Sequence, residues 1–555
     1  MTAVRYWAFL GYLVLSLVLF GRGALFHPDS VCACSGNGDP TSFMWSFEWW
    51  PHAILNGLNP FEPHVIWAPE GANLTQGGFA LPAATLLMAP VTLLAGPMVS
   101  YNIVSVLLPV LAAWFTYRLC DYVTGNFAAA FVGGLVFGFG TYMSAHLLGH
   151  LNLASVFLAP AGVLLVLQRL DEKISRRRFA VLMAVVFGVQ VLLSAEMLLI
   201  GLLVGAFALL VAYAASDSQR RGRIVGLVPA ALAGGGLAML ATSPYLYWTI
   251  HGLGDADSDA WKTFTDLYPG DALNPLLPTD VTWIGHSWFE DTTAKFTNFT
   301  PAEAAAYVGP VLLGIVVAFA VTHWRRPAAK VLLAVIALCY VLSLGTELHV
   351  GGDAKGVWMP WAALHPLPVL DHVISTRFWA YALLAIAIAV ALWLAAPGRR
   401  PGLRWAFAAV GVLLLVPNLS SDFWDSRPTD PALFRTDAYK RHIHKGERVL
   451  ALPYARYGSS MLWQARAGMD FDLVEGYVSP EFPPDYRGDP FFGTLVSGRV
   501  GKESTAGLRD FLDRRKVGAV VIDGKDAGGW PFVLGALGLK RVRTGGVLVY
   551  RVPAA

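Results

Sequence analysis

The residues of this chain that could act together chemically are acids, two histidines and one arginine at the ends of long apolar runs. Asp39 begins a predicted helix in the first long polar loop, and Glu196 separates two apolar runs. His146 and His150 flank the turn after a third run, and Arg377 stands just before a fourth. Ionisable groups at the edge of a membrane are costly, which makes these five residues candidates for function.

The residue types indicate transfer of a group from a phosphate. A carboxylate can deprotonate an acceptor hydroxyl, and a cation can balance a departing phosphate. We predict Asp39 as the base and Glu196 as a second catalytic residue, with Arg377, His146 and His150 on the phosphate. Each also has a structural alternative: the acids can cap a helix or lie in the interface, the histidines can be structural, and Arg377 can reach toward lipid headgroups.

The first polar loop adds aromatic and polar side chains suited to a sugar. Asp39 as N-cap, Pro40 in the first turn and Gly57 as C-cap predict a helix that ends at about Asn56. Indole rings on this helix can stack on sugar faces, although they also commonly anchor a helix at a membrane surface. The candidate acceptor-binding residues are Trp45, Glu48, Trp49, His52, Asn59 and Glu70.

Metal chemistry has weaker support in the sequence. Asp255, Asp257 and Asp259 could bind a divalent cation through oxygen ligands. Acids spaced by two in a glycine-containing loop are more typical of a solvated segment. We therefore predict no metal ligands and leave a divalent cation open as a cofactor.

The composition indicates a membrane protein. Of the 555 residues, 55% are hydrophobic and only 14% are charged, about half the charged share of a soluble domain. The mean hydropathy is +0.52. The net charge of +3, without a basic stripe, argues against a nucleic-acid partner.

Eleven apolar runs approach the length that crosses a bilayer. They lie at 6–25, 99–119, 126–145, 152–169, 179–195, 197–215, 224–242, 309–323, 330–345, 379–397 and 404–420. A further run at 80–97 contains three prolines, and we expect it to be re-entrant or interfacial.

The distribution of basic residues predicts the orientation. Four short loops, near 171–178, 216–223, 324–326 and 398–404, are rich in arginine, whereas loop 26–79 contains no Lys or Arg. Basic loops face the cytoplasm, so eleven spans place the N-terminus inside and residues 421–555 outside. A rival topology of twelve spans would leave the non-basic first loop in the cytoplasm.

Two domains are expected. Residues 1–420 form a polytopic α-helical membrane domain with an interfacial first outer loop, 26–98. Residues 421–555 form an extracytoplasmic α/β domain, because short alternating runs at 448–453 and 517–522 predict strands and 505–515 predicts an amphipathic helix.

This layout resembles the GT-C superfamily of polyprenyl-phosphate-sugar-dependent glycosyltransferases. The first loop, with Gly38-Asp39-Pro40, Trp45, Trp49 and His52, continuing through Asn59-Pro60-Phe61 to Pro69-Glu70-Gly71, is similar to the opening of large actinobacterial membrane proteins of this kind. The resemblance implies that Asp39 is the first-loop acid and that Arg377 lies near the donor phosphate. It also implies a bacterial plasma-membrane location. The chain lacks the paired acids of better-known members, so Glu48, Glu70 and Glu196 compete as the base.

The resulting hypothesis is an inverting membrane glycosyltransferase. It would move a sugar from a polyprenyl-phosphate donor to a cell-envelope glycan, lipid or protein at the outer face of the bilayer. The alternatives are a transporter or flippase of a lipid-linked glycan, and a non-catalytic envelope scaffold. A transporter usually has polar groups at mid-membrane and repeated halves; here the polar groups gather at one face.

Overall fold

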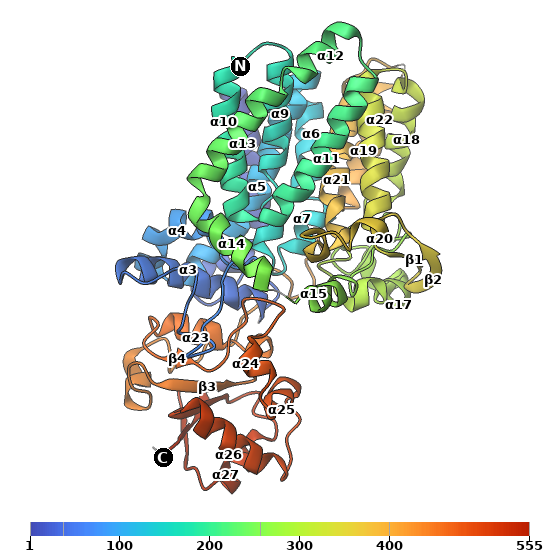
Figure 1. Ribbon diagram of the computed structural model, residues 1–555. Helices are drawn as coiled ribbons and strands as arrows, with labels where there is room; N and C mark the ends of the chain where they lie inside the picture. The colour runs from blue at the N-terminus through green and yellow to red at the C-terminus, as the bar shows by residue number, and fades with distance from the viewer. Residues whose placement is uncertain (1, 37, 256, 399, 554–555) are drawn as a thin grey trace. The chain divides into compact units, whose positions relative to one another are not determined.

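The computed structural model describes residues 2–36, 38–255, 257–398 and 400–553. By their internal contacts these residues divide into two units (Figure 1). The first unit contains residues 1–22, 104–246 and 257–423, and the second contains residues 23–103, 247–256 and 424–555. Three helices, α2 (Arg22–Phe26), α5 (Pro97–Thr124) and α14 (Ser243–Asp255), have residues in both units.

The first unit is a helical bundle. Its long helices are α1 (Thr2–Leu19), α6 (Phe127–Gly138), α9 (Leu158–Leu170), α10 (Arg176–Leu193), α11 (Ala195–Ala214), α13 (Val228–Ala241), α18 (Gly309–His323), α19 (Pro327–Ser343), α21 (Trp379–Ala395) and α22 (Pro401–Leu413). Its shorter helices are α7 (Thr141–His146), α8 (Leu151–Ala154), α12 (Ser218–Val225), α15 (Ser258–Thr265), α16 (Gly285–Trp288), α17 (Glu290–Thr293) and α20 (Trp361–Leu364). Three 3-10 turns, η1 (Phe296–Phe299), η2 (Leu370–His372) and η3 (Ser375–Phe378), and a hairpin of β1 (Glu347–Val350) and β2 (Asp353–Trp358) complete it.

Each of the eleven predicted spans overlaps helices of the first unit or α5, and the further run at 80–97 forms α4 (Pro82–Ala95) in the second unit. Six helices in the described part of the chain are long and apolar enough to cross a membrane. Most of the remaining runs form helices of 13–17 residues, which are shorter than these six. The helix α10 has 18 residues, but it begins with three charged arginines. The chain is therefore a multi-pass helical protein, while the number of about eleven spans stays a prediction.

Polar side chains define where several of these helices begin. Asn126, Ser175, Ser194 and Asp217 each accept a hydrogen bond from a backbone N–H in the first turn of the helix that follows. Such caps satisfy donors that a helix start otherwise leaves unpaired. The caps separate α10 from α11 by a single residue and so place Glu196 in a helix's first turn.

Two of the basic connectors of the bundle contact each other. Arg220 of α12 pairs with Asp171 at 2.8 Å, which joins two of the basic connectors. Figure 1 shows α12 at the end of the bundle where the chain begins, and α7 and α20 at the other end. This arrangement agrees with basic loops that share one face. The side of the membrane on which that face lies stays a prediction.

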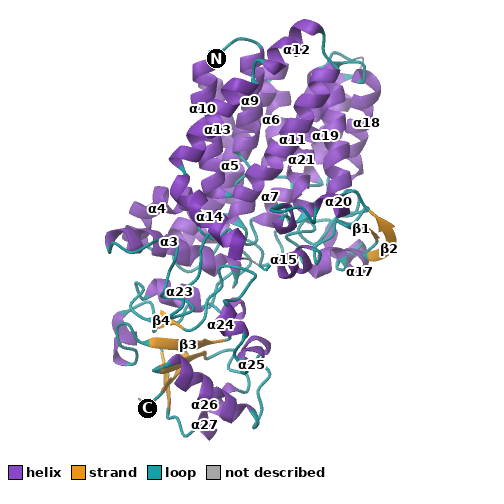
Figure 2. Cartoon of the chain, viewed as in Figure 1, coloured by secondary structure: helices purple, strands orange, loops and turns teal. Residues whose placement is uncertain are grey.

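The second unit is an α/β structure (Figure 2). Its sheet has the order β4-β3-β5-β7-β6, from β3 (Arg448–Leu452), β4 (Asp472–Leu473), β5 (Ala519–Asp523), β6 (Arg541–Thr544) and β7 (Val547–Arg551). Its helices are α2 (Arg22–Phe26), α3 (Asp39–Leu55), α4 (Pro82–Ala95), α23 (Ser460–Arg466), α24 (Pro484–Arg487), α25 (Phe492–Ser497), α26 (Ser504–Arg515) and α27 (Trp530–Ala536), with 3-10 turns η4 (Asp437–Arg441) and η5 (Ala455–Tyr457).

The sheet contains the predicted strands. β3 pairs in parallel with both β4 and β5, and β7 pairs antiparallel with β5 and β6. β3 and β5 are buried almost throughout, as expected for apolar strands that neighbours cover on both sides. The strands at 448–453 and 517–522 and the helix at 505–515 are thus confirmed to within two residues.

The first polar loop is joined to this sheet. The backbone N–H of Leu473 donates to Val65 O at 2.8 Å, and the N–H of Trp67 donates to Glu475 O at 3.0 Å. Gln464, which is fully buried, donates to the carbonyls of Val65 and Phe471, both at 2.7 Å. The loop and the C-terminal residues therefore belong to one unit, and the chain enters that unit for the last time at Trp424. The predicted boundary between two domains at residue 420 stays a prediction.

Candidate active site

The first unit holds a cluster of one arginine and two acids. Arg377 donates from Nη1 to Glu196 Oε2, and from Nη2 to Glu303 Oε1 at 2.9 Å. Its Nε also donates to Glu303 Oε1 at 3.3 Å. The side chains of Arg377 and Glu303 are 12% and 3% exposed, so this Arg377 cluster (Glu196, Glu303 and Arg377) is an enclosed ionic group with one net negative charge.

Three separate elements supply the cluster. Arg377 lies in η3, directly before α21, which is the most deeply buried long helix of the bundle. Tyr381 of α21 donates to Met197 O and holds α11, with Glu196, against it. Glu196 Oε1 also accepts from the Ile374 N–H at 3.3 Å. Packing around a central helix thus fixes the arginine and its first acid.

Glu303 reaches the cluster from the loop before α18. Its Oε2 accepts from the Thr376 hydroxyl at 2.7 Å. Burial is the largest single influence and raises the pKa of Glu303, but the Arg377 guanidinium, its hydrogen bond and the nearby histidines together lower this pKa to about 2. Sequence reasoning missed Glu303 because it lies in a loop rich in acids. One sequence feature could have indicated Glu303: it lies six residues before an apolar run, as Glu196 lies directly before another.

The two predicted histidines lie beside this cluster. Thr141, at the start of α7, donates to the carbonyls of Ala305 and Tyr307 at 3.0 and 2.6 Å, and this joins α7 to the loop that carries Glu303. Both histidines lie close enough to Glu303 that a positive charge on either would favour its ionised form. Within the described residues, the buried Nδ1 of His146 has no hydrogen-bond partner. The structure therefore brings Glu196, Arg377, His146 and His150 near one another, and their role in a shared site stays a prediction.

Asp39 lies in the second unit, in the first turn of α3. Gly38, with φ of 81°, is the N-cap, and no side chain caps the helix. The prediction that Asp39 is the N-cap is therefore wrong by one residue: glycine adopts the positive φ needed here, and Asp39 is already helical. Its carboxylate is half-buried near the positive end of the helix dipole. Earlier in this loop, Cys32 and Cys34 are joined by a disulfide.

The two predicted sugar-stacking indoles are buried inside the second unit. Trp45 and Trp49 stack with ring centroids 5.4 Å apart and are at most 2% exposed. Trp45 Nε1 donates to Gln464 Oε1 at 2.6 Å, and Trp49 Nε1 donates to Pro60 O at 2.9 Å. These two indoles pack against protein, and their role in acceptor binding stays a prediction.

The other predicted acceptor residues are spread over the second unit. His52 stacks on Trp49 at 6.0 Å, and burial lowers the pKa of His52. Asn59 is exposed and accepts from the Phe61 N–H at 3.1 Å. Glu70 pairs with Arg515 at 2.8 Å and so ties the first loop to α26. His52 lies one turn after Glu48 on α3, whereas Glu70 is held by α26 instead.

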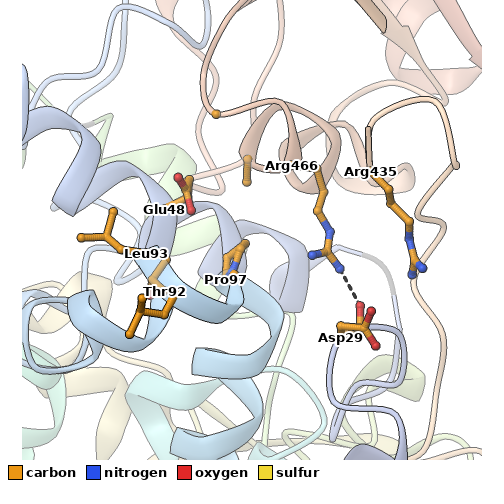
Figure 3. Close-up of a pocket in the computed structure, with 11 residues that line it drawn as sticks. Asp29, Glu48, Thr92, Leu93, Pro97, Arg435 and Arg466 are labelled. Atoms are coloured by element: carbon orange, nitrogen blue, oxygen red, sulfur yellow. Dashed lines mark hydrogen bonds between the residues drawn. The ribbon is translucent and has the colours of Figure 1, made fainter. Parts of the chain in front are cut away.

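Glu48 lines a cavity of about 340 Å³ in the second unit (Figure 3). Burial raises the pKa of Glu48 to about 7, although the charge of Arg466 opposes the shift. The cavity also holds Arg435 and Arg466, which share the carboxylate of Asp430. We call Arg435, Asp430 and Arg466 the Arg466 cluster. No sequence pattern signals it, since its members lie in loops and in a short helix of the C-terminal region.

A metal centre is not evident in the described residues. They contain no group of three or more His, Cys, Asp or Glu side chains that could hold a metal ion. Asp257 accepts from the backbone N–H groups of Asp259 and Ala260 and so caps α15, and the side chain of Asp255 lies outside the described residues. Asp257 therefore acts as a helix cap in the described structure, and a divalent cation as cofactor stays a prediction.

Comparison with known proteins rests on structure alone. No family model and no curated protein sequence matches this chain. The oligosaccharyltransferase of Archaeoglobus fulgidus in its apo form matches with a TM-score of 0.60 at 12% identity, over 96% of this chain and 71% of that one. The same enzyme in complex with Zn and sulfate matches with a TM-score of 0.57, over 98% of this chain and 73% of that one.

A second solved structure matches equally well. The arabinofuranosyltransferase AftD from Mycobacteria has a TM-score of 0.57 at 16% identity, over 99% of this chain. Both neighbours are GT-C glycosyltransferases. This chain has the GT-C fold. It spans 40% of the length of the AftD chain. The fold similarity covers both the helical bundle and the polar loop that follows the first helix.

Proposed function

We propose that the protein is a membrane glycosyltransferase that moves a sugar from a polyprenyl-phosphate donor to a cell-envelope glycan, lipid or protein. The observation that carries this proposal is the GT-C fold over nearly the whole chain. The enclosed ionic cluster of the helical unit supports it, because buried charge in a membrane protein usually marks a functional site. The bacterial plasma membrane, with the C-terminal region outside, is the proposed location.

Arg377, His146 and His150 are proposed to bind the donor phosphate. A guanidinium has five N–H donors, and three of those on Arg377 are engaged by Glu196 and Glu303. Two donors remain, and the unpartnered Nδ1 of His146 can supply another hydrogen bond when protonated. Glu196 and Glu303 hold the guanidinium in place. Two acids against one arginine also give the site a net negative charge. An entering phosphate must therefore bring a cation with it or displace one of the acids from Arg377.

Asp39 is proposed as the general base. Its carboxylate would take the proton from an acceptor hydroxyl while that oxygen attacks the anomeric carbon. The bond between the anomeric carbon and the phosphate oxygen would break with inversion, and polyprenyl phosphate would leave. Its place in the first turn of α3 supports this role, since helix formation holds the carboxylate in a defined position.

The test is a transfer assay with full-length purified protein, radiolabelled polyprenyl-phosphate sugars and candidate acceptors. Asp39→Asn should lower the rate by at least about a hundredfold, the usual contribution of a general base. Glu62→Gln changes another acid of the same loop and serves as the matched control, with an expected rate near that of the wild type. Transfer by Asp39→Asn at the wild-type rate, or no transfer from any polyprenyl donor, would contradict the proposal.

A further inference from the structure

The cavity beside Glu48 has a polar wall and an apolar edge. Figure 3 shows Glu48, Thr92 and Leu93 across the cavity from Arg435 and Arg466. All the lining residues belong to the second unit. None of them has been given a role in the proposed transfer except Glu48, so the cavity needs an occupant of its own.

One shared acid holds the two arginines of the polar wall. Asp430 Oδ2 accepts from Arg435 Nε at 3.0 Å, and from Nε and Nη2 of Arg466 at 3.1 and 2.9 Å. Arg466 Nη2 also donates to Asp29 O at 2.6 Å. These contacts fix both guanidinium groups and leave Arg466 Nη1 and both terminal nitrogens of Arg435 without a partner in the described part of the chain. Two cations against one acid give this wall a net positive charge.

The backbone keeps the free edge of Arg466 open. Gly96, at the end of α4, has φ of 88°, and a Cβ at this position would come within 3.3 Å of Arg466 Nη1. The remaining acids oppose an anion only weakly. Asp29 is exposed and therefore solvated, and with a pKa near 7 Glu48 is partly neutral at neutral pH. Guanidinium pairs of this kind favour phosphate, which accepts two parallel hydrogen bonds.

The apolar edge indicates where that phosphate comes from. Leu93 and Leu94 line the cavity, yet they are 57% and 88% exposed. Leu87, two turns earlier on α4, is 78% exposed. A free phosphate ion gains nothing from contact with exposed leucines, whereas the acyl chains of a lipid can pack against such a helix face.

We propose that the cavity binds the headgroup phosphate of an anionic membrane lipid, with the phosphate between Arg435 and Arg466 and the acyl chains along Leu93 and Leu94. This site would hold α4 at the membrane surface. It is separate from the Arg377 cluster in sequence and in unit. The proposal does not depend on the transfer reaction.

The experiment counts bound lipid by native mass spectrometry of the full-length protein in detergent with added phosphatidylglycerol. Arg435→Gln should weaken binding about tenfold, the equivalent of one charge-assisted contact. Leu94→Gln should weaken it by a smaller factor. Arg509→Gln changes an exposed arginine of α26, outside the cavity, and should leave binding unchanged. Arg435 is held by a single contact to Asp430 and Leu94 is largely exposed, so both variants should fold, which thermal unfolding checks.

Inorganic phosphate and phosphatidylcholine distinguish the sources of the ligand. Phosphatidylglycerol binding that resists millimolar inorganic phosphate and exceeds phosphatidylcholine binding supports the lipid site. Equal binding by the wild type and Arg435→Gln would overturn it. Displacement by inorganic phosphate, together with no effect of Leu94→Gln, would also overturn it, because the cavity would then be a site for a free anion.

Discussion

The two ionic clusters of this protein use the same residue types in opposite proportions. In the first unit, one arginine lies between two acids, and the whole group is enclosed. In the second unit, one acid lies between two arginines at the wall of a cavity. Three of the five N–H donors of Arg377 bond to its two acids. In the Arg466 cluster, Arg466 Nη1 and both terminal nitrogens of Arg435 have no partner in the described part of the chain. The proportions give the Arg377 cluster a net negative charge and the Arg466 cluster a net positive charge, while both keep N–H donors that can bind a phosphate.

The largest expected effect follows removal of the central cation of the Arg377 cluster. Arg377→Met leaves Glu196 and Glu303 buried without compensation, and breaking such a group costs about 3–5 kcal/mol. Thermal unfolding of the full-length protein in detergent should show this loss. The triple variant with Glu196→Gln and Glu303→Gln should recover part of it. Equal stability of the single and triple variants would mean that the two acids are not ionised partners of Arg377.

A second prediction concerns acid unfolding. The pKa of Glu303 is held at about 2, below its ordinary value of 4.5, so its contribution to stability is present above pH 4.5 and is lost as the pH falls toward 2. The contribution is on the order of 3 kcal/mol. A pH series of unfolding temperatures should show a steeper acid limb for the wild type than for Glu303→Gln. Parallel acid limbs would refute the ionised pair.

The next prediction has the opposite sign and lies in the second unit. Burial raises the pKa of Glu48 above its ordinary value of 4.5 to about 7, so ionisation opposes folding, and stability falls as the pH rises from 4.5 to 7. Glu48→Gln should therefore stabilise the protein above pH 7 by about 1–3 kcal/mol and change little below pH 4.5. A loss of stability above pH 7 would indicate that the ionised carboxylate is a needed partner of Arg466.

The smallest effect separates the two arginines of the Arg466 cluster. Arg435 is 36% exposed, and among the described residues its side chain hydrogen bonds to the shared acid alone, so Arg435→Gln should cost less than about 1 kcal/mol. Arg466 is 13% exposed and also donates to the Asp29 carbonyl, so Arg466→Gln should cost about 1–3 kcal/mol. Equal costs in chemical or thermal unfolding would show that the two cations hold the cluster equally.

The sequence predicted the parts of this structure that local pattern controls. Apolar runs located the helices, and alternating segments located β3 and β5. Glu196 and Arg377 stood out because charge beside an apolar run is rare. Glu303 did not, because an acid in a polar loop is ordinary until the fold pairs it with Arg377. The same reason explains Trp45: a helical stripe of indoles does not reveal whether lipid, sugar or Gln464 will cover it.

Backbone detail and long-range pairing account for the remaining differences. The sequence predicts Asp39 as the N-cap of α3, but Gly38 adopts the positive φ at that position. The sequence groups the first loop with the membrane helices by order along the chain, and it gives no sign that Val65 and Trp67 hydrogen bond with residues more than 400 positions later. Pairings of that range depend on the complete fold.

The most direct test of the central claim measures release of free polyprenyl phosphate by the purified full-length protein given a polyprenyl-phosphate sugar and an acceptor. The account predicts acceptor-dependent release by the wild type and by Glu62→Gln, and a loss of at least about a hundredfold in Asp39→Asn. Release by Asp39→Asn at the wild-type rate would contradict the role of Asp39. No release from any polyprenyl-phosphate sugar would contradict the account as a whole.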